Sequence, residues 1–280
     1  MVQDLSNFIS EVWSKKLTAL LDKSGVMMQC VNRNYEGEIK NSGDTVHIRT
    51  FGDVTVKDYS GGITYDELTS PTDTLLIDQK KYFAFKVDDI SKAQSNIDIM
   101  AGYLERAKVA IDLAKDTFLL GKHVDVPSGN IVGSDETPVA LTKDNIYTNF
   151  VAVAKALKKA NATSKGQKPW IVINPDIEAL LIQAPEFIQA NQTGDKTLKE
   201  GSIGKIAGLE VLVCTNFTAT SGKYYVVAGT NDAVTFASQV VEIESLRLQD
   251  SFDTAVRGLY VYGAKTVLAD ALAKLVCTVA

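Results

Sequence analysis

The chain is poor in the residue types that build catalytic and metal sites. Its 280 residues include two histidines, His47 and His123, which lie far apart and outside any HExxH spacing. No GxSxG segment occurs, so there is no sign of a serine nucleophile. The three cysteines, Cys30, Cys214 and Cys277, are distant from one another and show no CxxC spacing, which favours buried thiols over disulfides or a thiolate metal site. The sequence therefore predicts no catalytic residues, no metal and no cofactor.

An excess of positive charge is also absent. The chain has 29 basic and 34 acidic residues, a formal net charge of -5, which argues against a protein that grips nucleic acid phosphates. No stretch approaches the ~20 consecutive apolar residues of a membrane helix. Asp4, Glu11, Lys15 and Lys16 interrupt the pattern that a signal peptide would need. We expect a protein of the soluble phase, with DNA at most as a non-specific neighbour.

Apolar residues recur with helical spacing from residue 4 to about residue 23 and predict an N-terminal amphipathic helix. The apolar face is wide and must pack on the rest of the molecule or on a neighbour. Binding to a membrane surface is the weaker alternative, because the polar face is mixed in charge. The face contains Leu5, Phe8, Ile9, Val12, Trp13, Leu17, Leu20 and Leu21.

Two segments with period-two alternation, residues 45–51 and 75–87, predict long strands joined by a tip at Tyr59, Ser60, Gly61 and Gly62. A two-stranded hairpin buries too little apolar surface to be stable alone in water. It must therefore lie against its own domain or against another copy of the chain. This feature predicts an assembling protein.

A long amphipathic helix is expected next, from Ile97 to Leu120, with Gly121 as its stop signal. At ~1.5 Å per residue it would be roughly 36 Å long. Asp250, Asp253 and Thr254 are expected in a turn between the last two strands. The other predicted elements make an α+β fold: a helix over 142–161, a strand over 170–173, a helix over 176–183 capped by Asn174 or Asp176, and strands over 209–213, 224–228, 233–248 and 255–267.

Five short sequence segments occur in a characteristic order along the chain. They are GDTV at residues 43–46, FKVDDI at 85–90, VINP at 172–175, GSIGKIAGLEV at 201–211 and FDTAVRGLYVYG at 252–263. Together with the order of elements, they resemble the major capsid proteins of tailed bacteriophages, which have the Hong Kong 97-like fold. The resemblance covers nearly the whole chain. It implies an α+β capsid fold with an N-terminal arm at residues 1–34, an extended loop at 35–87, a peripheral domain at 88–127 and 231–280, and an axial domain at 128–230.

The resemblance also implies a function. The chain would be a non-enzymatic shell subunit that assembles with itself into pentamers and hexamers of an icosahedral shell around double-stranded DNA. Assembly would take place in the bacterial host cytoplasm and place the protein in the virion. Some family members carry an N-terminal scaffolding extension that a protease removes, whereas this chain starts with the arm helix. Either scaffolding comes from a separate protein or the chain is the processed, mature form. Met1 favours the first, so we expect a separate scaffolding protein, together with a portal.

Subunit contacts are expected in the arm and at the loop tip. The expected contact residues are Phe8, Val12, Trp13, Lys57, Asp58, Tyr59, Gly61 and Gly62. Two alternatives stay open. An encapsulin-like compartment shares the fold but encloses an enzyme as cargo. A soluble hydrolase is a further alternative, for which the sequence offers no catalytic constellation.

Overall fold

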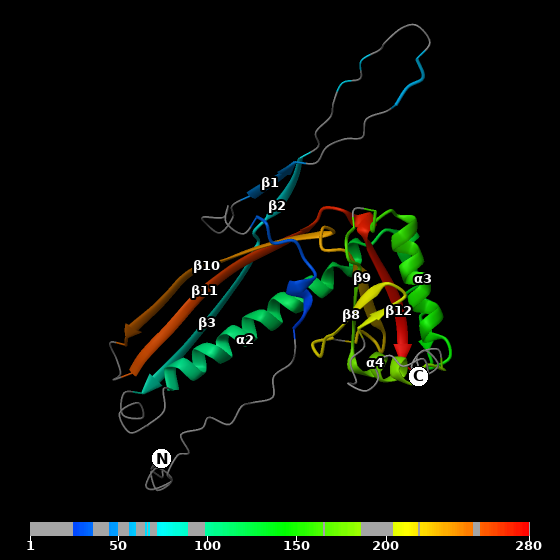
Figure 1. The fold of residues 1–280 in the computed structure, drawn as a ribbon. Coiled ribbons are helices and arrows are strands. Elements are labelled where there is room, and N and C mark those ends of the chain that lie inside the picture. The colour runs from blue at the N-terminus through cyan, green and yellow to red at the C-terminus, as the bar shows by residue number, and fades with distance from the viewer. Residues whose placement is uncertain are drawn as a thin grey trace.

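The structure, a computed structural model, describes residues 25–35, 45–49, 56–59, 65, 67, 72–88, 99–164, 166–185, 204–217, 219–248 and 253–279. Figure 1 shows a compact body, an elongated strand ribbon that lies along one long helix, and a loop that projects from the ribbon. The predicted N-terminal helix lies outside the described residues, as do Phe8, Val12, Trp13, Gly61 and Gly62.

A mixed seven-stranded sheet forms the body. Its strand order is β4-β12-β9-β6-β8-β7, and β5 also pairs with β12. All four residues of β6 are buried, as expected for a central strand that is covered on both faces. The strands are β4 (Ile131–Val132), β5 (Val139–Leu141), β6 (Trp170–Ile173), β7 (Lys205–Ile206), β8 (Leu209–Val213), β9 (Tyr224–Gly229) and β12 (Leu272–Val279).

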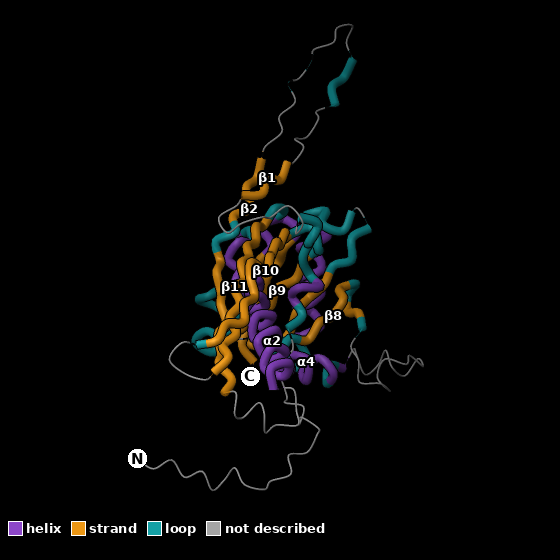
Figure 2. Tube along the Cα trace, turned by 90° about the vertical axis from the view of Figure 1, so that its left-hand side faces the viewer, coloured by secondary structure: helices purple, strands orange, loops and turns teal. Residues whose placement is uncertain are grey.

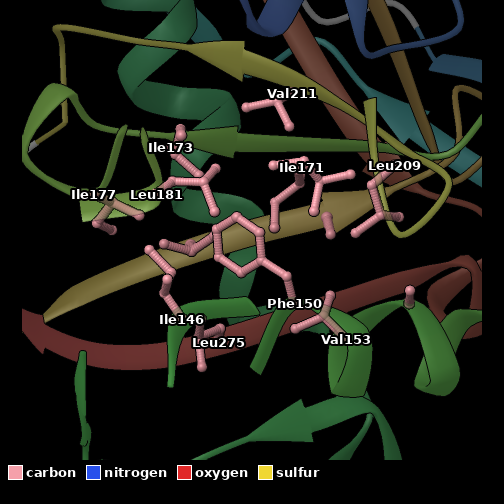
Figure 3. Close-up of a cluster of buried hydrophobic side chains, with 14 of the residues drawn as sticks. Ile146, Phe150, Val153, Ile171, Ile173, Ile177, Leu181, Leu209, Val211 and Leu275 are labelled. Atoms are coloured by element: carbon pink, nitrogen blue, oxygen red, sulfur yellow. The ribbon is translucent and has the colours of Figure 1, made fainter. Parts of the chain in front are cut away.

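Helices α3 (Ile146–Lys159) and α4 (Pro175–Ile182) cover one face of this sheet. Figure 3 shows the Phe150 ring pointing from α3 into the cluster formed with the sheet and α4. The predicted apolar face of α3 is confirmed, because all five of its residues are buried: Ile146, Phe150, Val153, Ala154 and Leu157. The start of α4 is also as predicted, since the Asn174 Oδ1 accepts a hydrogen bond of 2.9 Å from the Ile177 N–H.

A three-stranded antiparallel sheet forms the ribbon, in the order β10-β11-β3. Its strands are β3 (Gln79–Asp88), β10 (Val234–Arg247) and β11 (Asp253–Thr266). Helix α2 (Ile99–Leu120), about 33 Å long for its 22 residues, lies along one face of this sheet in both Figure 1 and Figure 2. The Phe118 ring of α2 meets the Tyr262 ring of β11 edge-on at 5.4 Å between centroids.

Short 3-10 helices connect these parts. They are η2 (Met27–Gln29), η3 (Gly121–Asp125), η4 (Ser128–Asn130) and η6 (Ala269–Ala271). The end of α2 and η2 pack on the face of the seven-stranded sheet that lies opposite α3, in a second buried cluster with Leu119, Val172 and Val227. The sheet is therefore covered on both faces.

The predicted hairpin is only partly right. Strand β1 (Thr45–Arg49) pairs antiparallel with β2 (Thr72–Leu76), and the single return strand expected over 75–87 is in fact two strands in different sheets. Ile77 and Asp78 separate β2 from β3, and β3 pairs with β11 instead. Four polar residues, Asp78 to Lys81, interrupt the apolar alternation at this point, but this local pattern does not say which strand each half pairs with.

Three further segments have pairing partners that the sequence did not indicate. The last part of the expected extended loop, residues 79–87, lies in the three-stranded sheet. Within the expected peripheral segment 231–280, β12 pairs with β9 in the seven-stranded sheet of the body. Asp253 and Thr254 belong to β11, where they pair with Asp88 and Val87, and not to a turn. In each case the hydrogen-bonding partner is distant in sequence, which a local pattern does not record.

Phe150 tests the core of the body. The change Phe150→Ala removes a side chain with no exposed surface and should lower the free energy of unfolding by about 3–5 kcal/mol. The matched control Val151→Ala, one residue further on the same helix and 40% exposed, should change it by less than about 0.5 kcal/mol. Urea denaturation of the unassembled subunit measures both, and equal effects would contradict the assignment of the α3 core face.

Candidate functional site

The extended loop is fastened at its root by a small apolar cluster of its own. Ile48 of β1, Leu75 of β2 and Ile77 pack with Ala237 of β10 and Val261 of β11. All five side chains are buried, the least buried being only 4% exposed. The two-stranded ladder is therefore held on the three-stranded sheet and does not rest on its own hydrogen bonds alone.

Gly263 of β11 makes this attachment possible. A Cβ at this position would lie 2.0 Å from the carbonyl oxygen of Leu76 and 3.1 Å from the Cα of Ile77. Backbone atoms cannot shift enough to accept a side chain at such a distance. The segment at Leu76 and Ile77 therefore crosses β11 at a position that has no side chain. Gly263 ends the segment FDTAVRGLYVYG, whose sequence does not indicate this role. The only sequence signal is a glycine inside an alternating strand.

Beyond the ladder, the described part of the loop exposes apolar side chains. Val56 is 95%, Tyr65 91% and Tyr59 78% exposed, and Lys57 and Asp58 are exposed as well. Figure 1 shows residues 56–59 at the far end of the projection, away from the body. Three large apolar side chains are therefore exposed on this one loop.

A buried carboxylate joins three separate parts of the subunit. Asp116 of α2 is 1% exposed and accepts hydrogen bonds from the Met27 backbone N–H at 2.7 Å and from the Cys214 thiol at 3.1 Å. Asn216 adds bonds of 3.0 Å to the Leu113 carbonyl and 2.9 Å to the Thr117 hydroxyl. These hydrogen bonds fix α2 to the segment at Met27 and to the segment that follows β8.

Burial governs the titration of these groups. Loss of hydration raises the pKa of Asp116, and the hydrogen bonds from Cys214 and Met27 oppose that rise only in part. Burial, with the neighbouring Asp116, raises the pKa of Cys214 to about 12, and burial raises the pKa of Cys277 to about 12. The expectation of buried thiols is confirmed, since Cys30, Cys214 and Cys277 are all buried.

The two histidines lie in different elements and have different surroundings. His47 is exposed on β1, whereas His123 stacks on Tyr225 with 4.4 Å between ring centroids, and its Nδ1 lies 3.0 Å from the Leu120 carbonyl. Within the described ranges, no group of three or more His, Cys, Asp or Glu side chains is arranged to hold a metal ion. Among the helices of the described part, none is long and apolar enough to cross a membrane.

Comparisons with known proteins agree on one family. A family model described as phage capsid protein matches residues 71–275. A solved structure of Mycobacterium phage Che8 contains a chain that is 30% identical, with a TM-score of 0.78 over 96% of this chain and 97% of that one. None of the curated proteins matches the chain.

Two further solved structures are similar at lower identity. The capsid of Cyanophage P-SCSP1u is 14% identical, with a TM-score of 0.75 over 100% of this chain and 96% of that one. The capsid of Ralstonia phage GP4 is 10% identical, with a TM-score of 0.71 over 97% and 96%. At these identities the two structures show a shared fold.

Asp116→Asn tests the buried carboxylate. The asparagine keeps an oxygen acceptor for the Met27 N–H but carries no charge. Because the pKa of Asp116 is raised in the folded state, the folded wild type binds more protons than the unfolded chain above about pH 4 and loses stability as pH rises through the raised pKa. The free energy of unfolding of the variant minus that of the wild type should therefore increase with pH over this interval. Urea denaturation at a series of pH values measures it, and a difference that falls with pH would refute the assignment.

Gly263→Ala tests the loop root. The added methyl group collides with the Leu76 carbonyl, so β2 must move away from β11 and the buried contacts of Leu75 and Ile77 loosen. We expect faster amide hydrogen exchange at residues 72–77, while β6 in the body keeps the wild-type exchange rate. Unchanged exchange at residues 72–77 would show that the close crossing does not hold the loop.

Proposed function

Because the chain belongs to the phage capsid protein family, we propose that it is the major capsid protein of a tailed phage or prophage, a subunit that assembles into pentamers and hexamers of an icosahedral shell around double-stranded DNA. The observation that carries this proposal is the match to the family model over residues 71–275. The geometry supports it, because a loop with a fixed root and an exposed apolar tip suits contact with a second copy.

The mechanism is geometric. Each subunit offers a projecting loop on one side and a body on the other, so the contact joins unlike surfaces of successive copies. Head-to-tail contacts of this kind form a closed ring when the rotation between successive copies divides a full turn evenly. Many weak contacts, repeated over every interface of a shell, then add up to a stable assembly.

An encapsulin-like compartment is less well supported. It would share the fold, but the family model that matches describes phage capsid proteins, and the 30% identical structure is that of a phage. A hydrolase finds no support either. We propose a structural role without catalysis, in the virion, after assembly in the cytoplasm of the bacterial host.

The partners beyond the chain itself are a scaffolding protein, a portal and the packaged DNA. The net charge of -5 favours DNA as a non-specific neighbour and not as a tightly bound ligand. We propose the same four regions: an N-terminal arm at residues 1–34, an extended loop at 35–87, a peripheral domain at 88–127 and 231–280, and an axial domain at 128–230. Strand β3 belongs to the three-stranded sheet and β12 to the seven-stranded sheet. The proposed contact residues of the loop are Lys57, Asp58, Tyr59, Gly61 and Gly62. Phe8, Val12 and Trp13 stay proposed contact residues of the arm.

Electron microscopy of the purified protein tests the function, and we expect closed shells of uniform diameter. The change Tyr59→Asp should reduce the yield of shells strongly, because it places a charge on an apolar contact. The subunit should keep its melting temperature, since Tyr59 is 78% exposed. Tyr59→Phe keeps the ring and serves as the control, with a shell yield near that of the wild type. Normal shells from Tyr59→Asp would exclude this residue from the contact.

A further inference from the structure

An open groove lies on α3, the helix that covers the face of the body opposite α2 (Figure 1). Its volume is about 480 Å³, within the range of sites that bind ligands. One side is formed by α3 side chains at helical spacing, from Tyr147 to Lys159, and the other by Ala207 in the turn between β7 and β8. We name this surface the α3 groove.

The floor of the α3 groove is apolar and reaches solvent. Tyr147 is 36% and Val151 40% exposed, and the two lie one turn apart on the same side of the helix. An amphipathic helix on a sheet normally turns polar side chains to the solvent. Here two large apolar side chains lie beside the buried face and extend it outward.

The turn at Ala207 adds a second apolar wall. It is a two-residue turn between Ile206 and Leu209, and both of its residues have positive φ, 52° at Ala207 and 88° at Gly208. Glycine or asparagine suits the first position better than alanine, which adopts this conformation only with strain. The turn itself therefore gives no reason for the methyl group that Ala207 adds to the groove.

The C-terminal half of the α3 groove is basic. Lys155, Lys158 and Lys159 are exposed, and within the described part of the chain none of them forms an ion pair. Helix α3 has no acidic residue at all, although the chain has 34 acidic and 29 basic residues. Lysines in the last turn suit the C-terminal end of a helix, which accounts for Lys158 and Lys159 but not for Lys155.

A partner that matches this surface is apolar and acidic at once. Nucleic acid would pair with the ammonium groups, but its phosphates offer nothing to cover Tyr147 and Val151. An uncharged apolar partner would cover the floor and leave the lysines without a counter-charge. From Tyr147 to Lys158 the groove follows α3 for about 16 Å, which is three helical turns. A second helix laid in such a groove buries its apolar face and pairs its charged edge with the rim.

We propose that the α3 groove binds an amphipathic helix of a second protein. The apolar face of that helix covers Tyr147 and Val151, and its glutamate or aspartate side chains pair with Lys155, Lys158 and Lys159. The groove lies away from the projecting loop, so both surfaces can be occupied at the same time (Figure 1). The proposal does not rest on the proposed shell function.

The experiment measures binding of a defined peptide to the full chain as the unassembled subunit. The probe is a fluorescein-labelled helical peptide of about 15 residues, with leucine on one face and glutamate beside it. The matched control peptide has lysine in place of every glutamate. We expect the subunit to raise the fluorescence anisotropy of the acidic peptide and not that of the basic one. Added salt should weaken the acidic complex.

Charge reversal makes the test specific to the groove. Lys155→Glu with Lys158→Glu should weaken binding of the acidic peptide by about tenfold or more, because two ion pairs become repulsions, and should let the basic peptide bind instead. Lys80→Glu with Lys108→Glu changes the net charge equally on β3 and α2 and should keep the wild-type affinity. Val151→Asp should also weaken binding, because it places a charge on the apolar floor. Circular dichroism of each variant checks that the fold is kept.

Other outcomes overturn the proposal. Absence of acidic-peptide binding, equal affinity for the two peptides, or equal loss in both double variants would show that the lysines of the groove do not select an acidic helix. A short DNA duplex that binds in place of the peptide, and is lost with Lys155→Glu and Lys158→Glu, would assign the groove to nucleic acid. Subunit dimers in sedimentation that the same double variant abolishes, without peptide binding, would assign it to a second copy. Shell formation is scored separately by electron microscopy, so failure of this proposal and failure of the capsid function are distinguishable.

Discussion

The carboxylate of Asp116 is the interaction on which the arrangement of the subunit depends. It lies where the long helix, the segment after β8 and the start of the described chain meet, and it accepts a hydrogen bond from each of the other two. A buried carboxylate without such donors would be costly, so the three parts are tied to one geometry. Gly25 lies directly against this carboxylate.

The extended loop obeys a different constraint, which is steric. Its root passes β11 so closely that only glycine fits at position 263, and five buried side chains then hold the root in place. The far end of the loop exposes Val56, Tyr59 and Tyr65. A fixed root with an exposed apolar tip agrees with the proposed contact between copies, because a repeated interface requires one orientation.

Much of the body could be predicted from the sequence. The buried face of α3, the central strand β6 and the Asn174 cap of α4 each depend on residues close in the chain, and each is as expected. The arm and the glycines of the loop tip lie outside the described residues, so their proposed contacts stay predictions. The exposed state of Lys57, Asp58 and Tyr59 agrees with a surface role but does not identify a partner.

The sequence by itself determined the helices α2, α3 and α4, most of the described strands and the resemblance to a capsid fold, because these depend on local periodicity and residue type. Only the tertiary structure decided that residues 72–88 are divided between two sheets, that β12 completes the sheet of the body, and that Asp116 and Gly263 hold special positions. These features arise from contacts between residues far apart in the chain. An alternating pattern records which face of a strand is apolar, but not which strand lies beside it.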